Sequence, residues 1–342
     1  MTPKSTIYEI AEKAGVSIAT ISRAVNPETQ HKVAPETLRK INTLVQKCCY
    51  TPNLAARHLS KTAYKTIGVL FPHHTGILVS DYYSQILSGV ADHLLTSDYR
   101  MKMILLKPEK PKWDRYDFKN GEGVDGLILT YWRTFFSDRS VFERLRIPCV
   151  VINNVEEDIR ARFAAGDHFQ GGWMAAEYLY SHGHRNIAVL SGVYGARDAK
   201  VRLNGFRSYL KTKGVSLDSN SIFDVNFEEE KAYEFSKKLL LTRSNLTAIF
   251  CMNDPQAFGV LKRLREMGIP CPGRISVMGY DDDHRSEHTE PPLTTIRVPV
   301  YQLAKQAAQD LIQYLQDKNS INFFKPCLLP VTLVERESVR KV

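Results

Sequence analysis

The sequence predicts an α/β protein, with a small N-terminal unit of three helices and a larger body of two lobes that each contain a parallel sheet. Short helices with recognisable caps fill the first fifty residues. From residue 66 onward, strand-like apolar runs alternate with amphipathic segments of helix length, a pattern typical of parallel sheets covered by helices. The chain has 342 residues, 43% of them hydrophobic and 24% charged, which suits two or three domains and excludes a disordered protein.

Caps predict the first two helices. Thr6 and Glu9 form a capping box, and Gly15 ends the helix that follows. Ser17 is the N-cap of a second short helix, which ends at Asn26-Pro27. Two short helices joined by a glycine-containing turn make a helix-turn-helix, whose second helix can enter a DNA major groove about 12 Å wide.

The second helix has an unusual outward face. Its inward residues are Ile21, Ala24 and Val25, and its outward residues are Ile18, Ala19, Ser22 and Arg23. An outward isoleucine suits contact with a thymine methyl group, and Arg23 can donate two hydrogen bonds to guanine. An ordinary helical hairpin is the alternative. A third helix that begins at Pro35 would complete a three-helix core.

Positive charge is concentrated at the N-terminus. The net charge is +9, from 46 Lys and Arg against 37 Asp and Glu. The first 64 residues contain nine of these cations and four of the anions. A basic head on a nearly balanced body is typical of a polyanion-binding module joined to a separate globular unit, although a solvated basic face gives the same count.

Several classes of site are not predicted. The six cysteines are scattered without a metal-ligand spacing, so we expect neither zinc nor disulfides. His182 and His184 lie in a helix-to-strand turn with no ligand partner nearby in sequence. No catalytic or cofactor-binding motif is present, so we expect no enzyme and no cofactor. Without an apolar run of roughly 18 residues or a signal-peptide core, we expect a cytoplasmic protein with no membrane partner.

Polar residues follow the predicted strands of the body. The strands are expected at residues 66–71, 101–106, 126–130, 149–152, 186–191, 248–251 and 275–279, with a helix at 82–95 between the first two. Asn153, Asn253, Asp254 and Asp281 stand at or just beyond strand ends, where ligands of such folds bind. Each of them alone is more typical of a helix cap.

The chain resembles a known family in two distinct regions. The run AEKAGVSIATISRAVN and the later YTPNLAARHL resemble the DNA-binding head and hinge of the LacI/GalR family of bacterial transcription regulators. The body matches the family at GVDGLIL, DHFQGGWMAAEYL, SHGHRNIAVLSG, RLNGF, NDPQAFG, GYDD and PPLTTI. The resemblance therefore covers essentially the whole chain. It implies a helix-turn-helix domain at 1–50, a hinge helix and linker at 51–64, and at 65–342 a two-lobed effector-binding and dimerisation body that is similar to periplasmic sugar-binding proteins.

The resemblance also implies how the head and hinge bind DNA. Ile18, Ala19 and Arg23 would read bases, while Ser17, Thr20, Ser22 and Asn26 would contact phosphates. Residues 53–60 would become helical on DNA, pair with a second subunit, and insert Leu59 into the minor groove; packing of Leu59 against the body is the alternative. The remaining residues expected at the DNA are Thr6, Asn53, Ala56 and Arg57. Ala34 departs from the family's Ser or Thr cap, so we expect the third helix to start less stably by about 1 kcal/mol.

For the body, the resemblance implies an effector in the cleft between the lobes. Arg202 and Asp281 would be its first polar contacts, and Asn153 and Asn253 would add amide contacts. The apolar walls would be Tyr82, Tyr83, Trp132 and Phe227, each of which could instead be core. The loop at 72–81 is longer than usual, Asn153 replaces a frequent Asp, and Trp132 is bulkier than the usual residue, which favours a larger ligand.

Together these observations lead us to expect a homodimeric transcription regulator on a pseudo-palindromic operator, a repressor of sugar-utilisation genes. A sugar or sugar derivative would be its effector, and we adopt induction, the family's commoner mode, as a hypothesis. The C-terminal residues 333–342 are strand-like and carry no leucine heptads, which favours a dimer over a tetramer. A solute receptor and a sugar-processing α/β enzyme are the alternatives; turnover of a bound ligand would reveal the enzyme.

Overall fold

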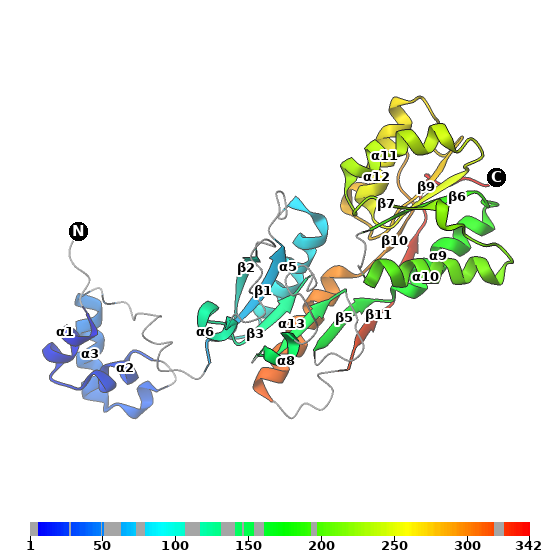
Figure 1. Cartoon of the computed structure of the whole chain (residues 1–342). Helices are drawn as coiled ribbons and strands as arrows, with labels where there is room; N and C mark the ends of the chain where they lie inside the picture. The colour runs from blue at the N-terminus through cyan, green and yellow to red at the C-terminus, as the bar shows by residue number, and fades with distance from the viewer. Residues whose placement is uncertain are drawn as a thin grey trace. The chain divides into compact units, whose positions relative to one another are not determined.

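The computed structural model describes residues 6–26, 29–48, 50, 63–72, 79–106, 117–130, 141–145, 147–153, 161–192, 197–317 and 325–342. The chain divides into two compact units, Met1–Tyr64 and Lys65–Val342, whose elements are labelled in Figure 1. Five predicted site residues lie outside the described residues, namely Asn53, Ala56, Arg57, Leu59 and Trp132.

The first unit contains the three predicted helices. They are α1 (Ile7–Ala14), α2 (Ile18–Ala24) and α3 (Pro35–Lys47), with a 3-10 turn at Gln30–Lys32. The Thr6 hydroxyl accepts the backbone N–H of Glu9 at 3.4 Å, and the Ser17 hydroxyl accepts that of Thr20 at 3.2 Å, so both predicted N-caps are confirmed. Gly15 takes a φ of 68°, the left-handed conformation that lets the chain turn between α1 and α2.

One isoleucine from each helix fills the core of this unit. Ile10, Ile21 and Ile41 are fully buried against one another's helices. The predicted inward face of α2 is confirmed for Ile21 and Ala24, while Ile18 is 40% exposed. Ala34 precedes α3 without a side-chain hydrogen bond, as expected from its lack of a hydroxyl.

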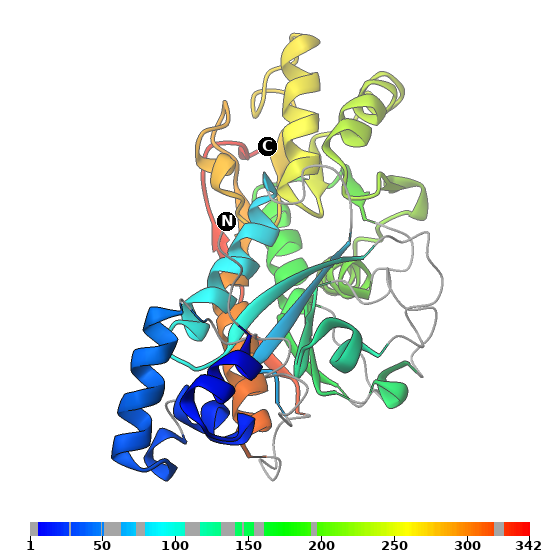
Figure 2. The same ribbon diagram turned by 90° about the vertical axis from the view of Figure 1, so that its left-hand side faces the viewer.

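The first lobe of the second unit contains a six-stranded parallel sheet with the order β11-β5-β4-β3-β1-β2. Its strands are β1 (Thr66–Pro72), β2 (Arg100–Leu106), β3 (Gly126–Leu129), β4 (Cys149–Ile152), β5 (Arg162–Gly166) and β11 (Cys327–Leu329). Its helices are α5 (Asp81–Leu94), α6 (Phe118–Glu122), α8 (Val141–Arg144) and α13 (Val300–Gln316). Helices α5 and α13 cover one face of the sheet, and α6 and α8 cover the other (Figures 1 and 2). Their buried side chains belong to two separate core clusters, one on each face.

The second lobe contains a four-stranded parallel sheet with the order β7-β6-β8-β9. Its strands are β6 (Ile187–Ser191), β7 (Ile222–Asp224), β8 (Ala248–Cys251) and β9 (Ser276–Met278). Helices α9 (His168–Ser181) and α10 (Arg197–Thr212) pack on one face, and α11 (Glu229–Thr242) and α12 (Asp254–Glu266) pack on the other. The predicted fold class, with parallel sheets covered on both faces, is confirmed.

Within the described residues, the chain passes between the lobes three times. The crossings follow β5, β10 (Thr295–Arg297) and β11, and a Cβ atom at Gly166 would lie 3.0 Å from Val298 and 3.1 Å from Val331. The three crossings therefore lie side by side. Strand β10 pairs antiparallel with β12 (Thr332–Val334), a small sheet that the sequence did not predict.

The expected strand at residues 333–342 is wrong beyond Val334. The Ser338 hydroxyl donates to the Val277 carbonyl at 2.6 Å and accepts the Thr294 N–H at 2.8 Å. The Ser338 side chain thus occupies a backbone carbonyl and a backbone N–H that a neighbouring strand would otherwise bond through its own backbone. Among the described helices, none has the length and apolarity needed to span a membrane.

Candidate functional site

Helix α2 presents a continuous polar and apolar face to solvent in the first unit. Ile18, Ala19, Ser22 and Arg23 are exposed, and Ser17 and Thr20 join their hydroxyls at 2.9 Å. This pairing occupies part of the hydrogen-bonding capacity of both hydroxyls. The exposed basic and apolar groups remain available for contact with a partner.

The flanks of this face are held by local hydrogen bonds. Thr6 also donates its hydroxyl to the Glu9 carboxylate at 3.2 Å, a side-chain contact across the first turn of α1. Just after α2, the Asn26 carbonyl accepts the backbone N–H groups of Thr29 and Gln30 at 3.0 and 2.9 Å. Thr6 and Asn26 therefore lie at the ends of the two helices, where backbone and side-chain groups can meet phosphates.

The second candidate site is made of the predicted effector-contacting residues that the structure describes. They lie beyond the strand ends of both lobes. Tyr82 and Tyr83 open α5, Asn153 follows β4, and the other four come from the second lobe. Those four are Arg202 on α10, Phe227 after β7, Asn253 after β8 and Asp281 after β9. The polar edge of each parallel sheet thus supplies the side chains, as parallel topology requires.

Arg202 is the centre of this site. It is only 3% exposed, and its Nη1 donates to the Met252 carbonyl. Its Nη2 lies 3.3 Å from His168 Nδ1, and its guanidinium lies 3.6 Å from the centroid of the Tyr280 ring. Its Nε has no hydrogen-bond partner among the described residues. A buried guanidinium is thus held in place on one edge while a donor is left unused.

Asp281 shares the electrostatic environment of Arg202. Burial raises the pKa of Asp281 well above its usual range, although the positive charge of Arg202 opposes the shift. Within the described residues, no hydrogen bond joins the two side chains. The Asp281 backbone takes a φ of 109° and its N–H donates to the Ile296 carbonyl at 2.8 Å, which ties this residue to β10.

The two asparagines already use their amides within the protein. Asn153 donates to the Tyr82 hydroxyl at 3.1 Å and accepts the Gly166 N–H at 3.3 Å. Asn253 accepts the Gln256 N–H as the N-cap of α12 and donates to the Phe227 carbonyl, both at 3.0 Å. Each asparagine therefore positions an aromatic residue of the predicted wall, and Asn253 is also the helix cap that its position suggested.

The aromatic residues differ in how far they belong to the core. Tyr83 packs edge-on against Phe71 at 5.6 Å and Tyr82 at 5.1 Å, and burial raises its pKa to about 12. Burial raises the pKa of Tyr82 well above its usual range, and Tyr83, Asp198 and Asp281 add to the shift. The charges that act on Tyr82 therefore include two carboxylates of the second lobe.

Three residues of this site were missed by sequence reasoning, namely His168, Asp198 and Tyr280. His168 is 5% exposed and its Nδ1 lies 3.1 Å from the Tyr280 hydroxyl. Burial and Arg202 hold the pKa of His168 well below its usual range, so the ring is neutral at pH 7. His168 and Tyr280 lie within DHFQGG and GYDD, two motifs that match the family. Their position in these motifs is the sequence signal that could have identified them as site residues.

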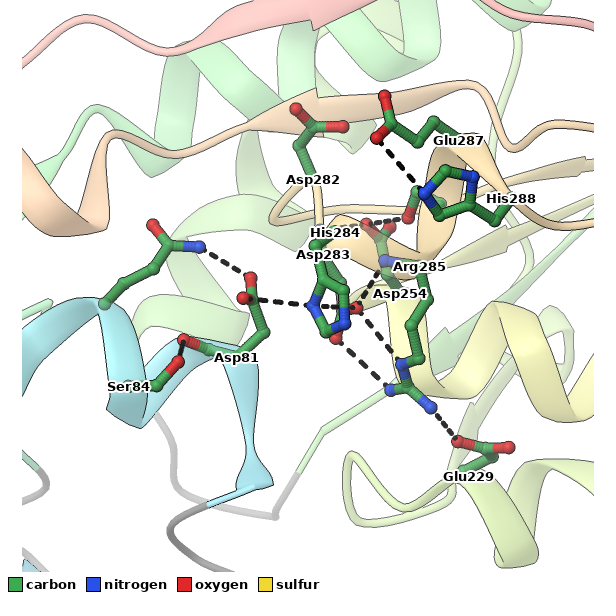
Figure 3. A network of polar contacts seen from close by, with 12 residues as sticks. Asp81, Ser84, Glu229, Asp254, Asp282, Asp283, His284, Arg285, Glu287 and His288 are labelled. Atoms are coloured by element: carbon green, nitrogen blue, oxygen red, sulfur yellow. Dashed lines mark hydrogen bonds and ion pairs between the residues drawn. The ribbon is translucent and has the colours of Figure 1, made fainter.

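A polar network joins the lobes beside this site (Figure 3). His284 Nδ1 lies 3.1 Å from Asp81 of the first lobe and 3.4 Å from Asp283 of its own. Arg285 donates to both Asp283 oxygens, at 3.1 and 3.2 Å. Since a guanidinium already occupies Asp283, we assign these groups as an ion-pair network rather than as ligands of a metal.

Asp254 anchors the loop that carries this network. Its carboxylate accepts the Thr295 hydroxyl at 2.7 Å, the Ser286 hydroxyl at 2.7 Å and the Asp283 N–H at 2.8 Å. A Cβ atom at Gly279 would lie 2.0 Å from the same carboxylate, so only glycine fits there. The Asp254 carboxylate therefore fixes the conformation of the loop at residues 279–287.

Comparisons with known proteins agree with this arrangement. Residues 6–53 match the lacI family of bacterial regulatory proteins, and residues 176–339 match the periplasmic binding protein-like domain. The transcriptional repressor PurR of Vibrio atlanticus is 31% identical over 317 residues, which cover 92% of this chain and 93% of the relative. The chain belongs to the LacI family.

Solved structures of LacI-family regulators share the fold. The lac repressor dimer bound to operator and the anti-inducer ONPF is 26% identical, with a TM-score of 0.83 over 98% of this chain and 99% of that one. A regulator from Enterococcus faecium with bound ribose is 25% identical, with a TM-score of 0.70 over 81% and 99% of the two chains. This LacI-family protein is a DNA-binding transcriptional repressor and not an enzyme.

Asp254 makes the stability of this LacI-family protein depend on pH. Burial raises the pKa of Asp254 to about 7, although its hydroxyl and amide donors oppose the shift, whereas an exposed Asp titrates at roughly 3.9. Between these values the folded chain holds a proton that the unfolded chain has released. The contribution of Asp254 to the free energy of unfolding should therefore fall as the pH rises from about 4 to about 7, and stay constant above.

Urea unfolding of the full chain from pH 4 to pH 8 measures this effect, with Asp254→Asn as the variant that does not titrate. We expect the wild-type free energy minus that of the variant to decline across this window. A difference that instead grows with pH would mean that the three donors outweigh burial and lower the pKa.

Proposed function

We propose that this repressor binds a pseudo-palindromic operator as a homodimer and that a small polar effector, a sugar or sugar derivative, controls its operator affinity. In this proposal residues 1–50 bind DNA, residues 51–64 form the hinge, and residues 65–342 bind the effector and the second subunit. The observation that carries it is the buried Arg202, which keeps an unused donor at the strand ends. Since its target is DNA, we assign the protein to the cytoplasm.

The exposed face of α2 supports the DNA-binding part of the proposal. Ile18 and Arg23 share this face, which combines an apolar contact with a bidentate donor. Ser17, Thr20, Ser22 and Asn26 would contact phosphates around it. Within the hinge, Asn53, Ala56, Arg57 and Leu59 would complete the interface in the minor groove.

Replacing Arg23 with Ala tests base readout. We expect a loss of about 1–3 kcal/mol in operator affinity and a relaxed preference at one base position in each half-site, measured by titrating a panel of operator variants. Arg39→Ala, which removes an exposed arginine from α3, is the matched control and should leave the base preference unchanged. An equal loss of affinity for every operator variant would assign Arg23 to a phosphate.

An exposed apolar stripe supports the homodimer. Met101, Met103 and Leu105 alternate along β2, which is the edge strand of the first lobe, and they are 37%, 38% and 41% exposed. Alternate residues of a strand point to the same face, so these three form one stripe. An uncovered apolar edge strand favours association, and a similar protein, the lac repressor, is a dimer.

Met103→Glu tests this interface. A charge in the stripe should weaken the dimer at least roughly tenfold, by analogy with the cost of an unpaired charge at an interface core, and sedimentation equilibrium of the full chain measures it. Leu241→Glu places the same charge at a residue of α11 that is 68% exposed and should leave the dimer unchanged. If the Met103→Glu variant dimerises as strongly as the wild type, the stripe is excluded as the dimer interface.

The effector is tested by thermal stability of the full chain. The panel contains monosaccharides, disaccharides, sugar phosphates, glycosides and purines, and a ligand at about 100 times its dissociation constant should stabilise the chain by roughly 2.7 kcal/mol. Asp281→Asn should abolish that shift while operator affinity stays near normal. Loss of both would mean that Asp281 supports the fold.

Under the induction hypothesis the ligand weakens operator binding; tighter operator binding in the presence of the ligand would make it a co-repressor.

A further inference from the structure

A cavity lies at the edge of the second lobe's sheet where the chain enters β6, β7 and β8. It has a volume of about 230 Å³ and is lined by residues of the connections that lead into these strands. The predicted effector residues Phe227, Asn253 and Asp281 instead follow the carboxyl ends of β7, β8 and β9. Because these strands are parallel, the two places are opposite edges of one sheet, and the cavity is separate from the candidate effector site.

The lining combines an apolar floor with polar groups. Ile187, Leu239 and Leu246 line the cavity and are buried. The lining residues that carry side-chain hydrogen-bond donors include Arg185, Asn186, Ser221, Arg243 and Asn245. A few polar groups over an apolar surface are typical of small-ligand sites. The volume lies below the roughly 300 Å³ at which such pockets usually begin, so the cavity suits a small metabolite.

Arg243 is held in place and keeps most of its donors. It is the residue that ends α11, and its Nη2 donates to the Asn220 carbonyl at 2.8 Å. This contact ties the guanidinium to the connection between α10 and β7. Its side chain makes no second hydrogen bond within the part of the chain that the structure describes. A guanidinium has five N–H donors, so four remain for a ligand.

Two amides beside Arg243 are also unused. The side chains of Asn186 and Asn245 form no hydrogen bond with the described residues, although the Asn186 carbonyl accepts the Thr247 hydroxyl at 3.2 Å. Each amide group can donate two hydrogen bonds. Arg185 is already committed, because its Nη1 donates to the Tyr180 and His184 carbonyls at 2.8 and 3.0 Å. Arg243 is therefore the cation that is available to a ligand here.

The charge of the lining is positive on balance. Arg185 and Arg243 are its cations, and Asp218 is the one acidic residue among the described residues that line the cavity. The Asp218 carboxylate accepts the backbone N–H of Asn220 at 3.0 Å as the cap of a 3-10 turn. This hydrogen bond holds the pKa of Asp218 below its usual range, and the charge of Arg243 adds to the shift. An anion would therefore meet more attraction than repulsion.

We propose that this cavity binds a small phosphate ester, at a ligand site distinct from the effector site. A phosphate monoester has three strong acceptor oxygens and a charge of about −1.5 to −2 at pH 7. A carboxylate has two oxygens and accepts about four hydrogen bonds. The free donors of Arg243, Asn186 and Asn245 exceed what one carboxylate can accept, so they favour the phosphate. The bound phosphate would join the connection from α10 to β7 with the connection from α11 to β8.

Isothermal titration of the full chain tests the ligand class. The probes are inorganic phosphate, glycerol 3-phosphate and, as the neutral match, glycerol. Ionic strength is held constant, because salt screens exposed charges. We expect both phosphates to bind and glycerol to give no signal. Glycerol that binds as well as glycerol 3-phosphate would overturn the proposal, and so would the absence of binding by both phosphates.

Arg243→Gln locates the site. The amide of Gln can still donate to the Asn220 carbonyl, but the charge and most donors are gone, so we expect both phosphates to bind at least about tenfold more weakly. Arg207→Gln is the matched control, since Arg207 is an exposed arginine of α10 that does not line the cavity. It should leave phosphate binding unchanged. Binding that Arg243→Gln does not weaken would place the phosphate elsewhere, for example on the basic first unit, and would overturn the proposal.

Asp218→Asn should act in the opposite direction. Asparagine is as good a cap as aspartate, so the turn is kept while the negative charge is removed. We expect phosphate to bind roughly threefold more tightly, as the loss of a partly screened repulsion predicts. Damage to the fold could not produce such a gain. Weaker or unchanged binding in Asp218→Asn would contradict a phosphate in this cavity.

The proposal stands apart from the effector function. Asp281→Asn should leave phosphate binding intact, because Asp281 lies at the opposite edge of the sheet. Loss of phosphate binding in Asp281→Asn, with Arg243→Gln unaffected, would assign the phosphate to the effector site and overturn the second site. A failure of the whole effector panel would leave this test unchanged.

Discussion

The burial of the Arg202 guanidinium is the constraint around which the second lobe is organised. A charge that is 3% exposed is tolerated only with partners, and Arg202 receives a carbonyl from the end of β8, an aromatic face from Tyr280 and the ring of His168. These partners come from different elements, so the guanidinium joins them. The close approach of α9 and α10 that this requires is possible only because Gly172 lacks a Cβ atom, which would lie 1.9 Å from the Arg202 carbonyl.

The same region lies next to the passages between the lobes. The Asp281 backbone bonds to Ile296 in β10, and β10 leads directly into a crossing. His168 begins α9 immediately after another crossing, at Gly166. A ligand held by Arg202 and Asp281 would therefore act on residues that lie one or two positions from the crossings between the lobes. Such a ligand can bias the lobes only by its difference in affinity for their two arrangements.

Local signals made much of the fold predictable. The caps at Thr6 and Ser17 depend on residues three positions apart, and the buried strands on continuous apolar runs, so both are readable from a short window of sequence. Strands β10, β11 and β12 have three residues each, too few for a periodic pattern. Their pairing is decided by the crossings between lobes, which no local pattern encodes.

The candidate site was predictable in position but not in detail. Polar residues at strand ends indicated a cleft, because parallel topology gathers those ends. The contacts that the Asn153 and Asn253 amides donate could not be predicted, since their acceptors lie 71 and 26 residues away. Asp198 was missed for a related reason: its relevance comes from Arg202 and Asp281, and only the folded chain brings a residue at the start of α10 beside the end of β9.

The network between the lobes is weak enough for an effector to control. His284 is 65% exposed at its side chain, and an exposed contact such as that between His284 and Asp81 contributes at most roughly 0–1 kcal/mol even when both groups are charged. Coupling between an effector and a second site is typically about 1–3 kcal/mol. A ligand that contacts Arg202 in one lobe and Tyr82 in the other, as we propose, would therefore outweigh this contact.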